Sequence, residues 1–594
     1  MGATRARHPI RRLVPEWAGE LRDPETLKAD ISAGIAVALV LIPQSMAYAN
    51  LAGLPPIHGL YAGLLPMVVA ALFGSSRLLR SGPAAVMCIM TAAALEPLGL
   101  GPESYIGYAL LIAVMVGVLQ LALGVLRLGI LVDFISHPVV SGFTNAAALI
   151  IATSQIPKLF RIDIGDASRF MDRAAMILVQ AATSTHLATL AMTALTFAIL
   201  IGVKRWKPKF PAVLAAVAAA TAVSWLTGFA EAGGRIVGEI PVGLPAFRLP
   251  PFDKGAILQL IGPAITIALV GIMSAVSIAK VIAARTRQPF DPNRELIGQG
   301  LANVTASMFQ GCVVAGSFAR SAVNWKAGAR TPFSAVVAGT VVALTLLFFT
   351  PLLYHMPQAA LGVVTINAVT RLIQLDPIKR AWRAQKHCAI VAVATFLTTL
   401  LMAPRLEIGM LVGVVLSIVL YLSRTMRPRF SERGIHPDGS MRDADEDGLF
   451  TCPLVAVCRF DGSLFFANVG YFESLVLKIL ASKPHLRYLV VDATGINHLD
   501  ASGLDAFQSL AEQLKAQDIQ LHITHAKKQV MDVFRRTGFA EELGEDRFLP
   551  SSLDAIREAT GSAAKACAGP CPIHAGSEGT PVARDSSVCP HRIP

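Results

Sequence analysis

The stretch GSFARSAVN (Gly316–Asn324) places Arg320 within a region apolar enough to lie in a membrane, because residues 300–314 and 331–353 on either side are small or apolar. An ionised side chain at bilayer depth is costly and usually faces a cavity, so Arg320 is a candidate functional residue. Ser317 followed by Arg320 is typical of the cap and first turn of a short helix, whose free N–H groups favour anions. Together these features predict an anion site in a membrane transporter.

The composition supports a membrane protein. Of 594 residues, 54% are hydrophobic and 15% are charged, against about 25% charged in an ordinary soluble domain. The mean hydropathy is +0.56. The net charge of +12 comes from short basic clusters between apolar runs, such as 379–383 and 424–429. Such clusters orient a protein in the bilayer, so we predict no nucleic-acid partner. The scattered cysteines predict no disulfide framework, and the start of the chain shows no secretory signal.

Apolar runs of the length that crosses a bilayer, about 20 residues, fill most of residues 31–422. We predict a first membrane repeat over 28–227, a loop over 228–255 and a second repeat over 256–424. Each repeat has seven spans, and the predicted spans are 28–50, 57–74, 82–97, 105–125, 131–156, 186–203, 210–227, 256–284, 295–314, 317–328, 333–353, 358–374, 387–403 and 405–423.

The third span of each repeat is short and follows a glycine-containing break, Ser81-Gly82-Pro83 in one and Gly316-Ser317 in the other. Paired, interrupted segments at matching places point to a transporter's binding site. The alternative is that such glycines serve only close helix packing, which we favour for Gly53, Gly59 and Gly63.

An odd number of spans per repeat inserts the two repeats with opposite orientation, and an even total leaves both ends on one side. The basic N-terminal segment 1–27 and the cluster Arg424–Arg433 place that side in the cytoplasm. We therefore predict a multi-pass protein of the inner (plasma) membrane whose partner is the lipid bilayer.

The composition changes after residue 424. We predict a linker over 425–449, an α/β domain over 450–560 and a disordered tail over 561–594. The alternation of β-rich and helical stretches predicts a hairpin (454–460 with 464–467), helices at 470–481, 502–517 and 527–537, and strands at 488–492 and 520–524.

Several stretches resemble the sulfate permease (SulP) family of anion transporters. They are LIPQSMAYA (41–49), PPIHGLY (55–61), FISHPVVSGF (134–143), NRELIGQGLAN (293–303), MPQAAL (356–361) and the GSFARSAVN block. The soluble part resembles that family's STAS domain through LVVDATG (489–495) and DASGLD (500–505). Each stretch is a weak signal alone, but together and in this order they are specific.

The resemblance implies an α-helical polytopic membrane protein of fourteen helices, arranged as inverted repeats and divided into core and gate domains. It also implies a cytoplasmic STAS domain and a homodimer. A small anion, such as sulfate, bicarbonate or a similar oxyanion, would lie near the midplane between the facing starts of the two short helices. The core would move against the gate to expose the anion to each side in turn.

Position by position, the resemblance assigns the anion to residues on several helices. The substrate-binding candidates are Gln44, Tyr48, Gly82, Ala84, Ser274, Ser317, Phe318, Ala319 and Arg320. Gln44 and Tyr48 lie four residues apart on one face of a first helix that we expect to be broken at Pro43. Phe318 and Ala319 would offer backbone N–H groups, and Arg320 a charge that does not deprotonate.

Each assignment has a structural alternative. Gln44 can mend the backbone beside Pro43, Tyr48 can be an interfacial aromatic, and Ser317 can act only as a helix cap. Arg320 can pair with a buried carboxylate or with backbone carbonyls.

Two positions depart from the family pattern. Ser274 lies in GIMSAVSIAK (271–280), where many bacterial relatives have a carboxylate suited to coupling with protons or sodium. We therefore predict that the anion itself balances Arg320, which favours anion exchange or uncoupled passage over cation symport. Arg80 stands where the family commonly has a small or hydroxyl residue. It either adds positive potential at the mouth of the site or, as we favour, extends to an interface.

Outside the membrane repeats, Ser502 matches the serine that is phosphorylated in bacterial anti-sigma-factor antagonists of the STAS fold. It is a candidate regulatory residue, with a helix cap as the favoured alternative. The tail residues Cys567, Cys571, His574, Cys589 and His591 have spacings that can hold zinc, but no predicted fold supports them, so we predict no metal site.

The main hypothesis is thus a secondary anion transporter. The alternatives are an anion channel, a dicarboxylate transporter of the same fold, and a signalling scaffold whose STAS domain binds a cytoplasmic protein. No nucleophile–base set and no phosphate loop is present in the sequence, so we predict neither an enzyme nor a cofactor.

Overall fold

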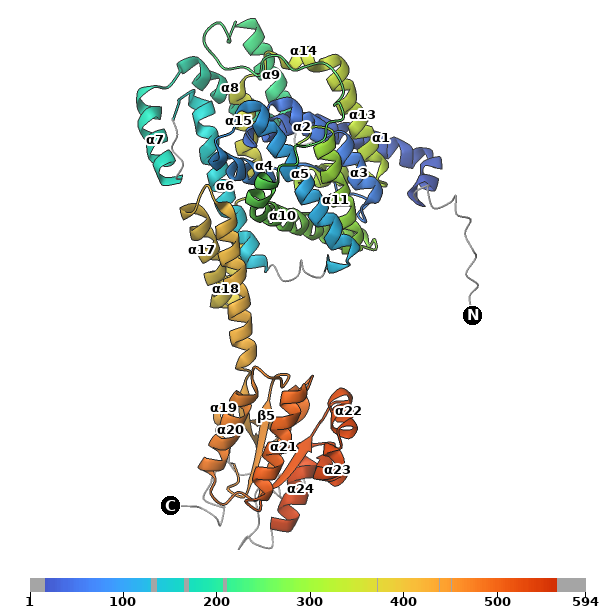
Figure 1. Ribbon diagram of the computed structural model, residues 1–594, viewed down its shortest axis with the longest axis vertical. Helices are drawn as coiled ribbons and strands as arrows, with labels where there is room; N and C mark the ends of the chain where they lie inside the picture. The colour runs from blue at the N-terminus through green and yellow to red at the C-terminus, as the bar shows by residue number, and fades with distance from the viewer. Residues whose placement is uncertain are drawn as a thin grey trace. The chain divides into compact units, whose positions relative to one another are not determined.

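The apolar runs form helices, since a helix satisfies its own backbone hydrogen bonds without water. The computed structural model (Figure 1) describes residues 16–129, 136–164, 170–206, 211–370, 372–436, 438–449 and 451–563. The chain divides into two compact units, Met1–Ile418 and Val419–Pro594. The first unit, where it is described, is helical apart from one pair of short strands.

Within the described residues, eight helical segments are long and apolar enough to cross a membrane. They are α1 (Pro24–Leu51), α2 and α3 (Pro56–Ala62 and Leu65–Phe73), α5 (Pro102–Val125), α6 (His137–Phe160), α8 (Leu187–Trp206), α10 (Lys254–Thr286), α13 with α14 (Phe333–Leu344 and Thr350–Leu353) and α18 (Leu406–Met426). Four shorter apolar helices are α4 (Ala85–Leu95), α9 (Ala212–Leu226), α15 (Gln358–Val369) and α17 (Lys386–Leu401). With α11 (Pro292–Met308) and α12 (Phe318–Lys326) they match the fourteen predicted spans.

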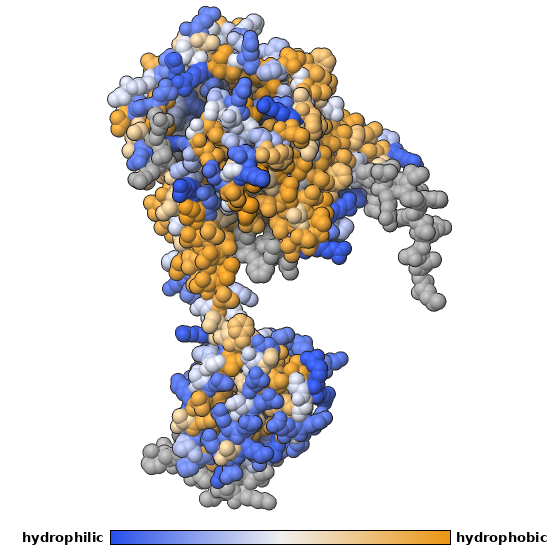
Figure 2. Space-filling model, in the orientation of Figure 1, coloured by the Kyte–Doolittle hydropathy of each residue, from blue (hydrophilic) through white to orange (hydrophobic). Residues whose placement is uncertain are grey.

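The membrane helices pack as two groups. Helices α1, α3, α4, α5, α10, α11, α12 and α13 contact one another and form what we call the core group. Helices α6, α8, α9, α15 and α17 form what we call the gate group, which meets the core group where α1 contacts α9 and α15 and where α4 contacts α6. Large hydrophobic side chains such as Leu258, Phe348 and Leu401 are exposed on this unit, and Figure 2 shows the broad apolar surface to which such side chains belong. That surface is what a bilayer would cover.

Two short strands connect the repeats at the centre of the core group. Strand β1 (Ser81–Pro83) pairs antiparallel with β2 (Val314–Gly316), with Gly82 opposite Ala315. Each strand leads directly into a short helix, β1 into α4 and β2 into α12. The antiparallel pairing makes the chain enter these helices from opposite directions, as inverted repeats require.

Helix α1 differs from its prediction. It is continuous from Pro24 to Leu51 and contains Pro43 in its interior, so the expected break is wrong. A proline removes only one N–H donor, and membrane helices tolerate that loss where neighbouring helices and local adjustments compensate.

The second unit contains a six-stranded sheet in the order β4-β3-β5-β6-β7-β8. The strands are β3 (Phe430–Ile435), β4 (Met441–Asp443), β5 (Val455–Phe460), β6 (Tyr488–Asp492), β7 (Gln520–Thr524) and β8 (Phe548–Leu549). Strand β3 is antiparallel to both neighbours, and β5 to β8 are parallel.

Alternation along β5 places its side chains in two hydrophobic cores. Ala456 and Cys458 join the core that includes α20 (Val469–Ser482), α21 (Ala501–Lys515) and α22 (Lys528–Arg536). Val455 and Val457 join the core beneath α24 (Ser552–Ala563). The predicted helices and the strands at 488–492 and 520–524 are confirmed within a residue or two.

Two predictions for this unit fail. The hairpin is wrong, since Leu464 makes an isolated parallel bridge to Leu499 and the antiparallel partner of β5 is β3. Strands β3 and β4 lie inside the stretch expected to be a linker. Polar β3 joins the sheet because its charges find partners, as in the ion pair between Glu432 Oε1 and Lys483 Nζ at 2.5 Å. The predicted disordered tail spans 561–594. From residue 564 on, this stretch lies outside the residues that the structure describes.

Candidate anion-binding site

Arg320 connects the two half-helices. It lies in the first turn of α12, where the hydroxyl of the N-cap Ser317 accepts a hydrogen bond from the Arg320 backbone N–H at 3.5 Å. Its side chain is fully buried, and Nη1 donates to the carbonyl of Pro83 at 2.8 Å. Pro83 ends β1, just before α4 begins. The guanidinium therefore lies where both short helices start.

Two donors of Arg320 have no partner. In the part of the chain that the structure describes, Nε and Nη2 are buried and make no hydrogen bond. No carboxylate of the described residues forms an ion pair with this guanidinium. Buried donors are nearly always satisfied in proteins, and an unpaired buried charge is expensive. An anion beside Nε and Nη2 would supply both missing acceptors and the missing negative charge.

Gly82 leaves room for the guanidinium. A Cβ atom at this position would lie 3.3 Å from Arg320 Nη2 and 3.4 Å from Cζ. Any larger residue would thus crowd the unpaired edge of Arg320. The close approach of the Arg320 guanidinium to the backbone is a physical reason for a glycine at position 82.

The other predicted residues contribute in different ways. Gln44 and Tyr48 are both buried on α1, and Tyr48 lies within electrostatic range of Arg320 together with Cys88 and Cys312. Ser274 of α10 donates its hydroxyl to the Gly316 carbonyl at 3.4 Å, so it contacts β2.

The residues that start the half-helices offer mainly backbone. Ala84 caps α4 in an extended conformation with no side-chain hydrogen bond, which leaves the N–H groups of the first turn for another acceptor. The Phe318 side chain is 56% exposed, so only its backbone N–H can serve the site. Ala319, next along the first turn of α12, likewise contributes only backbone.

Sequence reasoning missed the polar support of the strand pair. Asn303 of α11 donates to the Val314 carbonyl at 2.9 Å and accepts from the Val314 N–H at 2.8 Å. One turn earlier, Gln299 donates to Ser81 Oγ at 2.7 Å and to Glu295 Oε1 at 3.0 Å. The polar residues of NRELIGQGLAN, spaced four apart, were the available signal, because that spacing puts them on one helix face.

Arg80 contradicts its favoured prediction. It does not extend to an interface, since its side chain is fully buried. Its guanidinium donates to the carbonyls of Leu79 at 2.8 Å and Thr331 at 3.2 Å, and to the Ser334 hydroxyl. Its backbone carbonyl accepts from the Ser317 N–H at 3.1 Å. Arg80 thus holds the start of α12 in place and leaves only its Nε without a partner among the described residues, whereas Arg320 leaves both Nε and Nη2.

Ser502 is not the cap of its helix. Asp500 is the N-cap of α21, and its carboxylate accepts from Gly503 N–H at 2.9 Å and from Phe466 N–H at 3.0 Å. Ser502 follows in the first turn and is half-buried. The favoured interpretation of Ser502 as a cap is therefore wrong, and its regulatory role stays a prediction.

No group of three or more His, Cys, Asp or Glu side chains that could hold a metal ion occurs within the described ranges. The five tail residues considered for zinc lie beyond residue 563, outside those ranges.

The fold and the site together define a class: a polytopic membrane transport protein with paired half-helices around a buried arginine. Residues 27–395 match the sulfate permease family, and residues 451–555 match the STAS domain. The chain is 34% identical over 564 residues to "Sulfate transporter 4.1, chloroplastic" of Arabidopsis thaliana, covering 91% of this chain and 81% of that protein. A probable sulfate transporter of Mycobacterium tuberculosis is 32% identical over 538 residues, covering 89% and 95%. The chain belongs to the sulfate permease family.

Solved structures agree with the fold. The murine Solute Carrier 26 family member A9 anion transporter in the inward-facing state superposes with a TM-score of 0.84 at 22% identity, covering 94% of this chain and 96% of that one. The transmembrane domain of the cyanobacterial bicarbonate transporter BicA gives a TM-score of 0.57 at 25% identity, covering 66% and 97%. These relatives are transporters, in agreement with the prediction that the chain is not an enzyme.

Proposed function

We propose that this protein moves small inorganic anions across a membrane, with sulfate or a similar oxyanion bound at Arg320. The observation that supports this most strongly is the pair of unpartnered donors, Nε and Nη2, on a fully buried guanidinium at the junction of two half-helices. A guanidinium presents its donors as a planar fork that matches the oxygens of an oxyanion. The relatives named above are called sulfate and bicarbonate transporters, and these names point to the same class of substrate.

Access to the Arg320 side chain is restricted in this structure. Arg320 is fully buried, and it lines neither of two cavities that lie between the helix groups. Relative movement of packed helices would expose the Arg320 guanidinium, which is buried in this conformation. We infer that the core group moves against the gate group, opening the site first to one side and then to the other.

Two buried carboxylates of the core group, Asp30 and Glu295, are bound by backbone N–H groups. Asp30 accepts from the Arg330 N–H at 2.8 Å and from the Thr331 N–H at 3.1 Å. Glu295 accepts from the N–H groups of Ser75 and Ser76 at 3.0 and 2.9 Å. Neither carboxylate forms an ion pair with Arg320 among the described residues, and each is held by backbone N–H groups elsewhere in the core group, so we infer that neither balances the charge at the anion site.

Ser274 leaves the site without a carboxylate of its own. The bound anion then balances Arg320, which supports anion exchange or uncoupled passage over symport with a cation. The remaining elements of the proposal are a plasma-membrane location with cytoplasmic termini, a homodimer, and a cytoplasmic protein that binds the STAS domain.

The test is uptake of radiolabelled sulfate by proteoliposomes. Wild type is expected to show saturable uptake that is stimulated by internal sulfate or bicarbonate. Arg320→Gln should abolish it, because two charge-assisted hydrogen bonds are lost at about 1.5–3 kcal/mol each. Arg287→Gln, at an exposed arginine just beyond α10, is the control. Uptake by Arg320→Gln at the wild-type rate would refute the assignment of the site.

Further measurements separate the alternatives. Accumulation driven by an imposed proton or sodium gradient would contradict exchange, while leaving Arg320 as the anion site. Single-channel conductance far above carrier turnover would identify a channel. Uptake of fumarate in preference to sulfate would identify a dicarboxylate transporter.

A further inference from the structure

We propose a second anion-binding site at Lys158, between the gate group and the core group. The ligand is a small inorganic anion of the kind proposed for Arg320, so the inference rests on the proposed function. Lys158 would hold the anion briefly before it passes to Arg320. No sequence motif singled out this residue.

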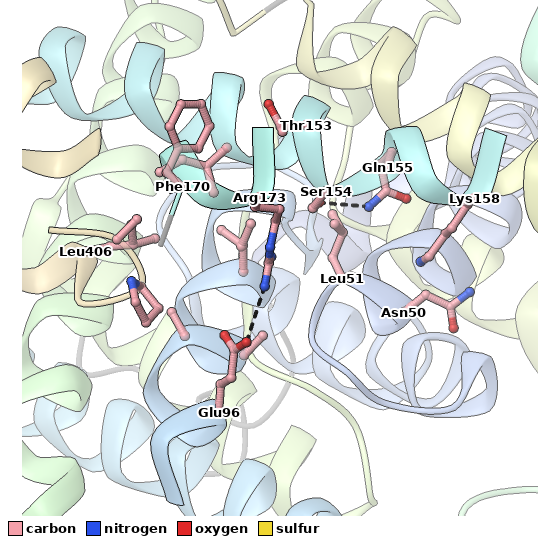
Figure 3. A pocket seen from close by; sticks show the side chains of 16 residues that line it. Asn50, Leu51, Glu96, Thr153, Ser154, Gln155, Lys158, Phe170, Arg173 and Leu406 are labelled. Atoms are coloured by element: carbon pink, nitrogen blue, oxygen red, sulfur yellow. Dashed lines mark hydrogen bonds and ion pairs between the residues drawn. The ribbon is translucent and has the colours of Figure 1, made fainter. Parts of the chain in front are cut away.

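Lys158 lines two adjoining cavities. One has a volume of about 190 Å³ and the other of about 530 Å³, and the residues common to both are Asn50 and Lys158. Figure 3 shows the Lys158 side chain extending from α6 toward Asn50, at the end of α1. Two hollows that share a wall at one lysine form a place where a small solute can rest beside its ammonium group.

Among the residues that the structure describes, none pairs with the charge of Lys158. Besides Lys158, the charged residues of the two linings are Glu96 and Arg173. These two form an ion pair, Arg173 Nη2 to Glu96 Oε1, at 3.3 Å. Lys158 makes no hydrogen bond and no ion pair with any residue that the structure describes. The described residues of the two linings therefore carry a net positive charge that an anion would neutralise.

Neutral donors around the ammonium complete the site. Asn50 can donate from its side-chain amide. The Gln155 amide already donates one hydrogen to Ser154 Oγ at 3.0 Å and retains a second. A cation with neutral donors beside it suits a chloride ion or a small oxyanion, whereas an organic cation would be repelled.

The cavity lies beside the helix that leads to Arg320. Ile89 and Ala92 of α4 line it, and α4 begins at Ala85 next to the arginine. Four residues of helix correspond to about 6 Å along its axis. Leu51, which also lines the cavity, is three residues from Tyr48 on α1. One wall of the cavity therefore belongs to the same short helix whose start adjoins Arg320.

Both helix groups contribute to the lining. Lys158 belongs to α6 of the gate group, while Asn50 and Ile89 belong to α1 and α4 of the core group. Relative movement of the groups would therefore change the distance between Lys158 and Arg320. A positive charge in a low-dielectric cleft concentrates anions locally and raises their rate of association, and salt screens this effect.

The first experiment measures sulfate uptake by proteoliposomes against external sulfate concentration, at low and high ionic strength. Lys158→Gln is expected to raise the half-saturating concentration at least about threefold at low ionic strength, with the ratio falling toward one in high salt. Lys158→Arg should restore the wild-type value. Lys254→Gln is the matched control. Lys254 is exposed and lines neither cavity. Its neighbour Asp253 accepts a hydrogen bond from the Tyr108 hydroxyl.

If Lys158→Gln behaves like Lys254→Gln in both salt conditions, the second site is refuted and Arg320 is unaffected. A second arm needs no transport. The apparent melting temperature of purified Arg320→Gln should rise with added sulfate at constant ionic strength, because one site remains. The rise should be absent in Arg320→Gln combined with Lys158→Gln. An equal rise in both proteins would overturn the proposal, even if wild type fails to transport sulfate.

Discussion

Replacement of Asn303 by leucine should damage the anion site from a distance. Asn303 donates to the Val314 carbonyl and accepts from the Val314 N–H. Val314 is paired with Pro83, which has no N–H to offer. Leucine is of similar size to asparagine but supplies neither bond. The strand pair that positions both half-helices would then no longer be held by a side chain at its Val314 end.

The expected cost follows from the orphaned groups. A buried backbone group left without a partner costs about 1–3 kcal/mol, so two such groups cost about 2–6 kcal/mol. Asn303 also donates to Gln120 Oε1 at 3.0 Å, and that acceptor would be orphaned as well. Because the unfolding entropy is about 2.1 cal/mol/K per residue, each kcal/mol lowers the melting temperature of a unit as large as Met1–Ile418 by about 1 °C. We therefore expect a fall of about 2 °C or more for Asn303→Leu.

The assay is the apparent melting temperature in detergent, followed by sulfate uptake of the reconstituted protein. Asn303→Asp keeps an acceptor for the Val314 N–H and should be intermediate. Thr305→Val is the control, because the Thr305 hydroxyl bonds to the Leu301 carbonyl of its own helix, at 2.8 Å. If Asn303→Leu melts within about 1 °C of Thr305→Val and transports with unchanged half-saturation, the reasoning about the strand pair is wrong.

Three more predictions concern other parts of the molecule. Gly82→Ala places a methyl group 3.3 Å from Arg320 Nη2 and should lower sulfate uptake about tenfold. The gel-filtration profile should stay normal. Unchanged uptake would show that the guanidinium is not confined. Glu295→Gln should lower the melting temperature without altering the pH dependence of uptake, and loss of a proton-driven component would instead make Glu295 the coupling residue. In the second unit, burial and then the charge of Arg547 lower the pKa of His522 below its ordinary value of 6.5. Because the unfolded chain then binds the proton more readily than the folded domain, stability should fall as pH drops below about 6.5, by at most about 1.4 kcal/mol per pH unit, down to the folded pKa. Hydrogen exchange of β7 in the full-length protein measures this fall, and His522→Gln should remove it.

Local signals were sufficient for the helices and for the candidate arginine. Apolar runs of membrane length specify spans because a helix needs no partner for its backbone bonds. The cap at Ser317 and the break at Gly82 lie next to the residues they affect, so the start of each half-helix could be predicted. The strands β6 and β7 were found for the same reason, since each is a short run of residues with high β-propensity.

The polar groups that satisfy one another could not be paired in this way, because their partners are distant in the chain. Arg80 and Arg320 look alike in the sequence, yet both terminal nitrogens of Arg80 are bonded and only its Nε lacks a partner, whereas Arg320 lacks partners at both Nε and Nη2. Strand β3 was taken for linker because its pairing with β5 joins residues about thirty positions apart. The charge at Lys158 could not be interpreted before the helices that leave it unpaired were in place. Local hydrophobicity thus specifies where the chain crosses the membrane, and contacts between distant segments specify which charges remain for an anion.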